Sequence, residues 1–261
     1  MPDRPWTREE VLLTISLYCK LPYRKLRQST AEVRELAQLL NRTPSAISKR
    51  CCNYVQFDPV ESKRVKGFTR AAKLDRSVWA EINCDWERFA TECEQIEKRV
   101  REEQSAPLLQ ENSVPSTCET VFPLGDTREQ IVKVRIGQRF FRDAVLTAYD
   151  RRCCVTGIKH DALLVASHIK PWKDSDPKTE RTNPRNGLCL SALYDKAFDA
   201  GLMTVDKEYR IIFSTSVLSC APQEEAQKFF CFYEGKELLL PDRFTPEQQF
   251  FEHHRNCIFI P

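Results

Sequence analysis

The second half of the chain contains two short apolar runs separated by a long polar loop, and this arrangement limits its fold more than any other feature. Residues 162–166 (ALLVA) form an apolar run that predicts a short strand ending at Ser167 and His168. Residues 170–185 hold three prolines and many charges, which is typical of a loop, and residues 186–190 predict a returning strand. The pattern therefore predicts a hairpin that places one imidazole at the edge of a small sheet.

A short helix is expected directly after this hairpin. Ser191 is a residue type that caps helices, the helix is predicted to run to about Ala200, and Gly201 is a type that ends one. Asp195 and Asp199 are four residues apart and share a face of this helix. Two carboxylates on one helix face offer the oxygen ligands that Mg²⁺ or Mn²⁺ prefers, and a neutral imidazole opposite them can take a proton from water. These residues indicate a compact site for phosphodiester hydrolysis, the alternative being a structural histidine beside solvated carboxylates.

Several motifs in this region occur together and in a fixed order. They are VASHIKPW, NPRNGL and ALYDKAFDAGL, with RIGQRFFRDAVLTAYDRRCCVTG before them. In these motifs the chain resembles an HNH endonuclease of the ββα-metal superfold, over residues 125–261. The resemblance implies a metal-dependent endonuclease of the bacterial restriction or defence type, with one Mg²⁺ or Mn²⁺ per site and double-stranded DNA as its substrate.

The resemblance also implies a role for individual residues. His168 matches the general base of the family, and Asn186 matches the middle asparagine, which fixes the loop and helps to orient the histidine. Asp195 and Asp199 fall where the family places the metal-binding residues of its helix. Position 195 is Asp where many members have His, which favours a harder metal than zinc. Ser167 lies where some members have an acidic ligand, so the complete ligand set is left open.

Three helices are expected within the first 56 residues. Helix-start signals precede each of them: Thr7 with Glu10, Ser29 with Glu32, and Thr43 with Pro44. A helix, a short turn and a second helix form the geometry of a helix-turn-helix, and the stretch RTPSAIS resembles one of the Myb-like or sigma-like kind. The alternative is a module for packing or dimerisation.

Basic residues are concentrated in the first third of the chain. The chain carries a net charge of +3, but residues 20–76 hold 14 Lys and Arg against 5 Asp and Glu, a net charge of +9. Such a surface is expected for nucleic-acid binding, the alternative being scattered solvated lysines. The third helix presents a small polar face that suits a major groove. The expected nucleic-acid contacts are Arg42, Lys49, Arg50 and Asn53 in this region, and Lys170 in the hairpin loop.

The remaining segments complete an α+β chain of two domains. Residues 77–104 are helical in composition, and residues 105–124 are a polar, proline-containing stretch without periodicity that predicts a linker. After the linker, residues 132–136 predict a short strand and residues 140–149 a helix with an aromatic face. The expected organisation is an all-α, helix-turn-helix-like domain over residues 1–104, a linker over 105–124, and an HNH nuclease domain over 125–261.

Composition narrows the class of protein further. No apolar run approaches the length of a membrane span and the first residues have no signal-peptide core, so a cytoplasmic protein without membrane contact is expected. The 12 cysteines are then expected to be reduced thiols. The chain has no C-x-x-C, and its close pairs, Cys51-Cys52 and Cys153-Cys154, are adjacent residues, so no structural zinc site is expected. His253 and His254 are expected to pack the last segment rather than to bind a metal.

Two functions of different classes are consistent with these features. The first is a metal-dependent DNA endonuclease, and the second is a DNA-binding regulator whose HNH fold is catalytically inactive. Cleavage of RNA differs from the first only in substrate, and the third helix favours duplex DNA. A single HNH site nicks one strand, so a double-strand break would require a homodimer or two encounters.

Overall fold

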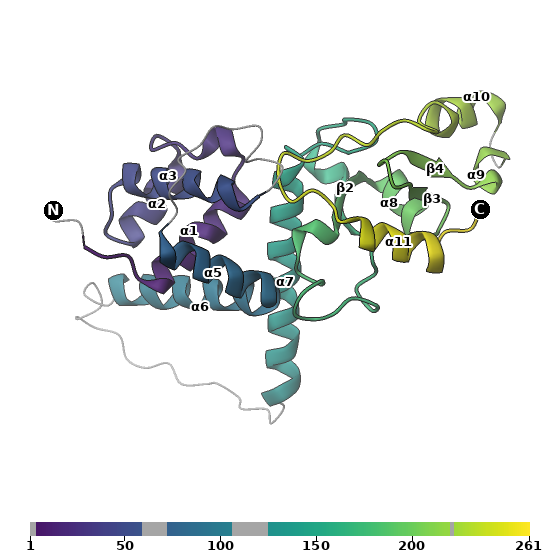
Figure 1. Cartoon of the computed structure of the whole chain (residues 1–261). Coiled ribbons are helices and arrows are strands. Elements are labelled where there is room, and N and C mark those ends of the chain that lie inside the picture. The colour runs from purple at the N-terminus through teal and green to yellow at the C-terminus, as the bar shows by residue number, and fades with distance from the viewer. Residues whose placement is uncertain (1–3, 59–71, 106–124, 220–221) are drawn as a thin grey trace, which may run out of the picture. The chain divides into compact units, whose positions relative to one another are not determined.

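The computed structural model describes residues 4–58, 72–105, 125–219 and 222–261 of the chain (Figure 1). They group into two compact units, one within Met1–Gln56 and Gly67–Phe140 and the other within Phe57–Lys66 and Phe141–Pro261. The division falls inside one long helix, α7 (Gly125–Ala148). The predicted linker, residues 105–124, lies outside the described residues except for Ser105, which ends a helix.

The N-terminal unit is built from helices, as predicted. Helix α1 is central, because the other four in the list below each pack against it (Figure 1). The helices before α7 are α1 (Arg8–Lys20), α2 (Ala31–Leu39), α3 (Pro44–Asn53), α5 (Lys73–Cys84) and α6 (Trp86–Ser105), with 3₁₀ turns at Tyr23–Lys25 and Tyr54–Phe57.

The starts of α1 and α3 confirm the local signals in the sequence. The Thr7 hydroxyl accepts a hydrogen bond from the backbone N–H of Glu10 at 3.3 Å, and the Glu10 carboxylate accepts one from the N–H of Thr7 at 3.0 Å. The Thr43 hydroxyl accepts from the N–H of Ala46 at 3.2 Å, with Pro44 at the first helical position. Both caps satisfy backbone donors that a helix start would leave unpaired.

The helix start predicted at Ser29 needs correction, and the helical prediction for residues 77–104 gains a break. Helix α2 has Thr30 as its N-cap without a side-chain cap, so the capping box predicted for Ser29 and Glu32 is wrong. The chain turns just before it, with the N–H of Thr30 bonded to the carbonyl of Arg27, and this moves the helix start by one residue. Residues 77–104 are helical, as predicted, and they belong to two helices because Asp85 leaves helical geometry at φ −157° and caps α6.

Two ion pairs with buried side chains connect α3 and the turn before it to α1 and α5. The Glu10 carboxylate accepts hydrogen bonds from Arg42 at 2.9 and 3.1 Å and from Arg4 at 2.7 Å. Arg50 pairs with Asp75, and the guanidinium groups of Arg42 and Arg50 each lie 4.2 Å from the ring of Trp6. The region around α3 is therefore held by charge pairs and cation–π contacts as well as by its apolar core.

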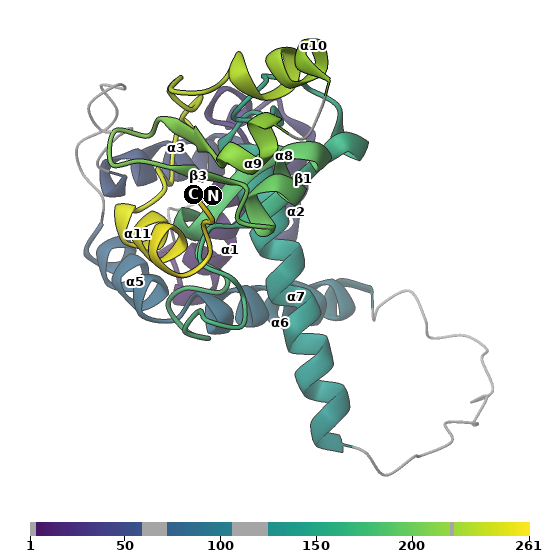
Figure 2. The same cartoon turned by 90° about the vertical axis from the view of Figure 1, so that its right-hand side faces the viewer.

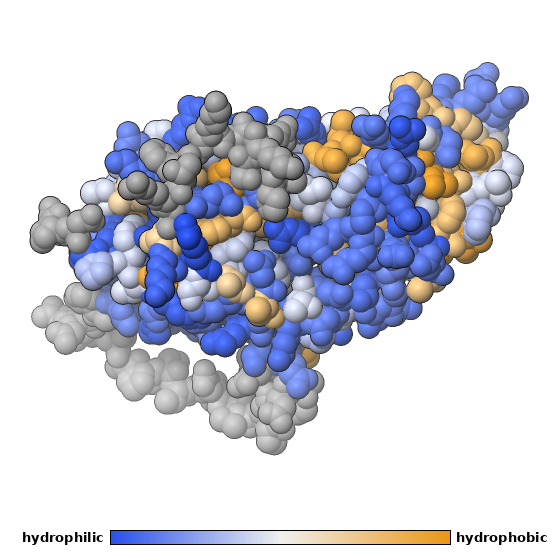
Figure 3. Space-filling view, in the orientation of Figure 1, coloured by the Kyte–Doolittle hydropathy of each residue, from blue (hydrophilic) through white to orange (hydrophobic). Residues whose placement is uncertain are grey.

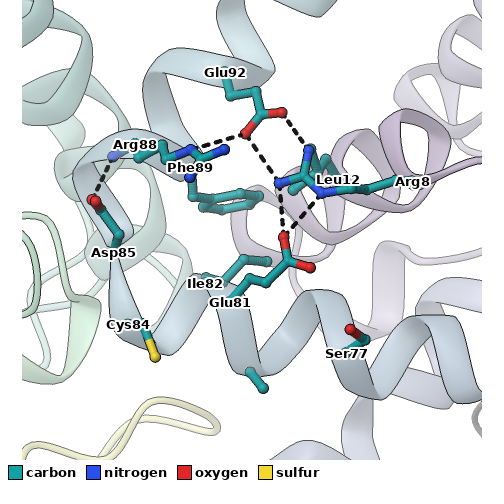
Figure 4. A pocket seen from close by; sticks show the side chains of 11 residues that line it. Arg8, Leu12, Ser77, Glu81, Ile82, Cys84, Asp85, Arg88, Phe89 and Glu92 are labelled. Carbon is teal, nitrogen blue, oxygen red and sulfur yellow. Dashed lines mark hydrogen bonds and ion pairs between the residues drawn. The ribbon is translucent and has the colours of Figure 1, made fainter.

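A second ion-pair cluster ties α1 to α5 and α6. Arg8 donates to Glu81 at 2.9 Å and to both oxygens of Glu92, above the buried ring of Phe89 (Figure 4). These residues line a surface groove that also includes Cys84. Because the charges in the groove pair with one another, the cluster stabilises the packing of α1 against α5 and α6.

The C-terminal unit contains two small antiparallel hairpins and several helices. Strand β1 pairs with β2, and β3 pairs with β4. The elements that follow α7 are β1 (Leu164–His168), β2 (Gly187–Ser191), α8 (Ala192–Asp199), β3 (Met203–Val205), β4 (Ile211–Phe213), α9 (Thr215–Ser219), α10 (Gln223–Ala226) with a π-helical turn at Gln227–Cys231, and α11 (Gln248–Cys257).

The first hairpin and α8 form the predicted strand–strand–helix unit. His168 pairs with Gly187 at one end of the hairpin, and Leu164 pairs with Ser191 at the other. Helix α8 begins directly after β2 and packs against both strands, so it runs back along the hairpin (Figure 2). The chain is therefore α+β, as predicted, with helices first and the ββα unit later.

The strand predicted for residues 132–136 is wrong, because these residues belong to α7. The β-branched residues at these positions favour a strand locally. However, buried residues further along α7, among them Phe141, Val145 and Ala148, recur at helical spacing and continue one helix.

Several large apolar side chains are exposed in the described part of the chain. Apolar atoms lie at the surface of the C-terminal unit around α10 (Figure 3), where Phe229 and Phe232 are 48% and 59% exposed. No helix in the described ranges combines the length and apolarity that crossing a bilayer requires.

Replacing Glu10 by Gln is expected to lower the free energy of unfolding of the N-terminal unit by about 3 kcal/mol, because buried Arg42 would lose its charged partner. Three of the four tryptophans lie in this unit, so tryptophan fluorescence during a urea titration follows its unfolding. Glu94→Gln, at an exposed position of α6, is the matched control and should leave the midpoint unchanged. Equal stability of the two variants would show that the ion pair does not hold this unit together.

Candidate active site

His168 lies at the end of β1 in a largely buried position that fixes its ring. The imidazole stacks on Phe141 with centroids 3.8 Å apart and planes 9° apart, and the ring of Trp172 meets it edge-on at 5.5 Å. Its Nε2 lies 2.8 Å from the backbone carbonyl oxygen of Arg181. A carbonyl oxygen can only accept, so Nε2 carries the proton in the neutral ring and the Nδ1 lone pair is available as a base.

The surroundings of His168 also favour its neutral form. Burial lowers the pKa of His168 below its ordinary value of 6.5, although the hydrogen bond to the Arg181 carbonyl opposes this shift. The imidazole is therefore neutral at physiological pH and able to accept a proton.

Asn186 is fully buried and fastens both ends of the long loop between β1 and β2. Its Oδ1 accepts from the N–H of Lys170 at 2.8 Å, and its Nδ2 donates to the Lys170 carbonyl at 3.1 Å. The same Nδ2 lies 3.2 Å from the Ser175 hydroxyl and 3.4 Å from the Glu180 carbonyl. Asn186 makes no contact of this kind with His168, and it acts on the backbone of the loop instead.

Further side chains in the loop hold the carbonyl that His168 uses. Lys170 pairs with Glu180 at 2.6 Å, and Glu180 also accepts from the N–H of Asp176 at 2.7 Å. The guanidinium of Arg181 donates to the carbonyls of Trp172 and Ser175, each at 3.1 Å. The Arg181 backbone is thus fixed from within the loop, and its carbonyl is aimed at Nε2 of the histidine.

Asp195 and Asp199 lie on one face of α8, as predicted. Partial burial raises the pKa of Asp199, and the nearby charge of Asp195 raises it further. The helix ends where the sequence predicts, with Gly201 at φ 71°, and a Cβ at this position would lie only 2.2 Å from the carbonyl oxygen of Ile258. Ser191 is the N-cap residue but makes no side-chain cap.

The two carboxylates of α8 have the chemistry to bind a hard divalent cation. Two carboxylates that repel each other would be stabilised by a cation between them, and oxygen ligands suit Mg²⁺ or Mn²⁺. The hydroxyl of Ser167, on β1 beside His168, is buried and has no hydrogen-bond partner among the described residues. Within those residues, no three His, Cys, Asp or Glu side chains form a group ready to hold a metal.

The structure separates the predicted nucleic-acid contacts into two groups. Arg42 and Arg50 are buried in ion pairs, and Lys170 is paired with Glu180, so these side chains are already engaged inside the fold. Lys49 is exposed on α3 and Asn53 is half-buried there, one helical turn away. Lys49 has the expected exposure, Asn53 is in part withdrawn from the surface because its Oδ1 is buried, and the engagement of the other three does not support their predicted role.

The C-terminal histidines provide a structural contrast to His168. His254 is buried and stacked on Phe198 at 3.8 Å, with Nδ1 3.0 Å from the Thr204 hydroxyl and Nε2 3.1 Å from the Phe198 carbonyl. Burial lowers its pKa to about 4. Since both of its nitrogens are engaged, His254 packs the last helix, as predicted from the sequence.

Three functional contributors were not predicted from the sequence. The sequence does not mark the backbone carbonyl of Arg181, because every residue has a backbone carbonyl. The sequence placed Phe141 on an aromatic helix face but did not indicate its contact with His168. Trp172 follows a proline within a loop, where the sequence predicts no contact. A useful signal for Phe141 is Gly187, because a buried strand glycine indicates a close neighbour on that face.

Comparison with known families agrees with this geometry. A family model described as HNH endonuclease matches residues 153–206, which include His168, Asn186, Asp195 and Asp199. Residues 153–206 form an HNH endonuclease domain.

One solved structure bears a distant likeness to part of this chain. A solved structure described as "Modification dependent TagI restriction endonuclease" is 19% identical, with a TM-score of 0.30, over 44% of this chain and 36% of that chain. The chain thus spans little more than a third of that relative. No curated protein matches this chain.

Three buried cysteines support the hairpin of the HNH domain. Cys153 accepts from the N–H of Ser191 at 3.2 Å, and the N–H of Cys154 donates to the carbonyl of Cys189 at 2.7 Å. Burial raises the pKa of Cys189 to about 12, so this thiol is unreactive at neutral pH. Packing is sufficient to explain the presence of these three cysteines.

Replacing Asn186 by Ala is expected to lower the stability of the C-terminal unit by about 2 kcal/mol, because buried loop groups would lose their partners. Amide hydrogen exchange should accelerate over residues 169–185, as measured by mass spectrometry. Asn256→Ala, at an exposed position of α11, is the control and should leave that exchange unchanged. Wild-type protection in Asn186→Ala would contradict the assigned role in the loop.

Proposed function

We propose that this protein is a metal-dependent endonuclease that hydrolyses phosphodiester bonds of double-stranded DNA. One observation carries the proposal: within an HNH domain, His168 is neutral, its Nε2 is held by the Arg181 carbonyl, and its Nδ1 is available as a base. The DNA substrate is implied by the HNH endonuclease family. An imidazole prepared in this way can act as a general base near neutral pH.

The proposed reaction begins with water. His168 takes a proton from the water at Nδ1, and the resulting hydroxide attacks the phosphorus in line with the leaving 3′ oxygen. The bond between phosphorus and this oxygen breaks and the oxygen takes a proton from solvent, so the products carry a 5′ phosphate and a 3′ hydroxyl. The imidazolium that forms is stabilised because the Arg181 carbonyl accepts the hydrogen bond from Nε2. Asn186 contributes indirectly by fixing the loop that holds this carbonyl.

Asp195 and Asp199 are the residues that would hold the divalent ion. When bound, Mg²⁺ or Mn²⁺ would polarise the scissile phosphate and neutralise charge on the leaving oxygen. The raised pKa of Asp199 supports this assignment, because a cation would relieve its repulsion with Asp195.

The N-terminal unit is proposed to bind duplex DNA through α3. Lys49 is exposed on this helix and would contact a DNA phosphate. Asn53 follows one turn later on the same helix face. We further propose that the protein acts in restriction or defence in the cytoplasm. A homodimer would be one way to cut both strands.

Plasmid cleavage tests this function directly. Wild-type protein should convert supercoiled plasmid to nicked or linear DNA with Mg²⁺ or Mn²⁺, and EDTA should stop the reaction. His168→Ala should bind DNA but not cut it. DNA binding without cleavage by the wild type under any metal condition would favour a DNA-binding regulator with an inactive HNH fold.

The cleavage rate should persist below pH 6.5. Because burial lowers the pKa of His168, its base form survives at pH values where an ordinary histidine is protonated. Single-turnover rates are measured from about pH 5 to about pH 8 at a fixed concentration of free metal. The acidic limb, the range in which the rate falls as the pH is lowered, should lie below pH 6.5. An acidic limb above pH 6.5 would contradict the assignment of His168 as this base.

Lys49→Glu is expected to weaken duplex affinity and to reduce the dependence of log Kd on log salt by about 1, because one phosphate contact is lost. Fluorescence anisotropy at several salt concentrations measures both quantities. Lys98→Glu makes the same charge change at a 77% exposed side chain of α6 and should have a smaller effect. Equal effects of the two variants would place the DNA-binding surface elsewhere.

A further inference from the structure

The ring of Phe141 lies flat against the imidazole of His168. The centroids are 3.8 Å apart and the planes differ by 9°, so the two rings are stacked almost in parallel. Phe141 is 2% exposed and comes from α7, whereas His168 ends β1. We infer that Phe141 is a positioning residue for cleavage, one that fixes the plane of the general base, and this inference rests on the proposed function.

The geometry explains why a hydrogen bond alone is insufficient. The bond from Nε2 to the Arg181 carbonyl fixes one atom of the imidazole, but the ring can still rotate about the line of that bond. A flat surface against the ring face removes this rotation. The bond and the stacked ring together define the direction of the Nδ1 lone pair, and proton transfer depends on that direction.

Gly187 shows that the fold makes room for this ring. It lies opposite His168 in the hairpin register. A Cβ at Gly187 would lie 2.9 Å from Cζ of Phe141 and 2.4 Å from Cγ2 of Val145. Any other residue would push against the stacked ring, so the Asn-Gly pair has two tasks: Asn186 fixes the loop and Gly187 admits Phe141.

The neighbouring Phe140 provides a matched comparison. It is buried to a similar degree, at 4% exposure, but it packs on Trp86 and Phe89 in the N-terminal unit. The same substitution at the two positions therefore removes similar apolar volume, and only Phe141→Leu removes the surface behind His168.

The experiment compares Phe141→Leu with Phe140→Leu in single-turnover cleavage at saturating protein. Phe141→Leu should cut more slowly by a factor on the order of 10 to 100, because the base is misdirected. Its Kd for DNA should remain within about twofold of the wild type, because His168 does not create affinity. Phe140→Leu should cut at nearly the wild-type rate.

Proton NMR of the imidazole supplies a readout that does not depend on activity. Among the four histidines, the resonances of His168 are identified as those that His168→Ala removes. In the wild type, the carbon-bound protons of His168 should be shifted upfield by the ring current of Phe141, and Phe141→Leu should abolish that shift. Phe140→Leu should retain it.

A second variant covers the case in which Phe141→Leu does not fold. Val145→Ala removes one of the two clashes at Gly187, so Val145→Ala/Gly187→Ala adds a methyl group that meets mainly the Phe141 ring. This double variant should cut more slowly than Val145→Ala alone.

The outcomes separate this inference from the proposed function. If Phe141→Leu loses the ring-current shift but cuts at the wild-type rate, the positioning role is overturned while the nuclease remains. Unchanged His168 resonances in Phe141→Leu would overturn the stack itself. Cleavage by His168→Ala at the wild-type rate would overturn the proposed function, and the positioning role with it.

Discussion

The rest of the site depends on the hydrogen bonds that the buried side-chain amide of Asn186 makes with the loop backbone. Its oxygen and nitrogen both bind the backbone of Lys170, and its nitrogen also reaches the carbonyl of Glu180 near the other end of the loop. A long loop between two five-residue strands would otherwise have many conformations, and ordering it costs conformational entropy. One side chain that satisfies several buried backbone groups offsets part of this cost and selects one conformation.

The ordered loop places the backbone carbonyl of Arg181 beside Nε2 of His168. A titratable side chain in this place would hold the proton less reliably. The carbonyl of Arg181 cannot titrate, so it holds the proton on Nε2 of His168 at any pH at which the fold persists. Burial then keeps the imidazole neutral. His254, which is also stacked on a phenylalanine but uses both of its nitrogens, shows that burial and stacking alone do not leave a nitrogen available as a base.

Local signals in the sequence predicted much of this fold. The caps at Thr7 and Thr43, the hairpin, and the helix ending at Gly201 depend on residues close together in the chain, and the structure confirms them. Features that depend on distant partners were missed. The burial of Arg42 and Arg50 depends on Glu10 and Asp75, and the continuation of α7 through residues 132–136 follows from the packing of the helix as a whole. The resemblance of the site motifs indicated His168 and Asn186, whose roles stay predictions, but it could not show that the link between them passes through the loop.

The protonation of the His168 ring tests this account most directly. Long-range ¹H–¹⁵N correlation spectra of the labelled protein at neutral pH distinguish the two neutral forms of an imidazole from each other and from the charged form. The structure predicts that His168 is neutral with its proton on Nε2, and that Asn186→Ala weakens this preference because the loop loosens. A neutral ring with the proton on Nδ1, or a charged ring, would contradict the account, because neither leaves Nδ1 free to accept a proton from water.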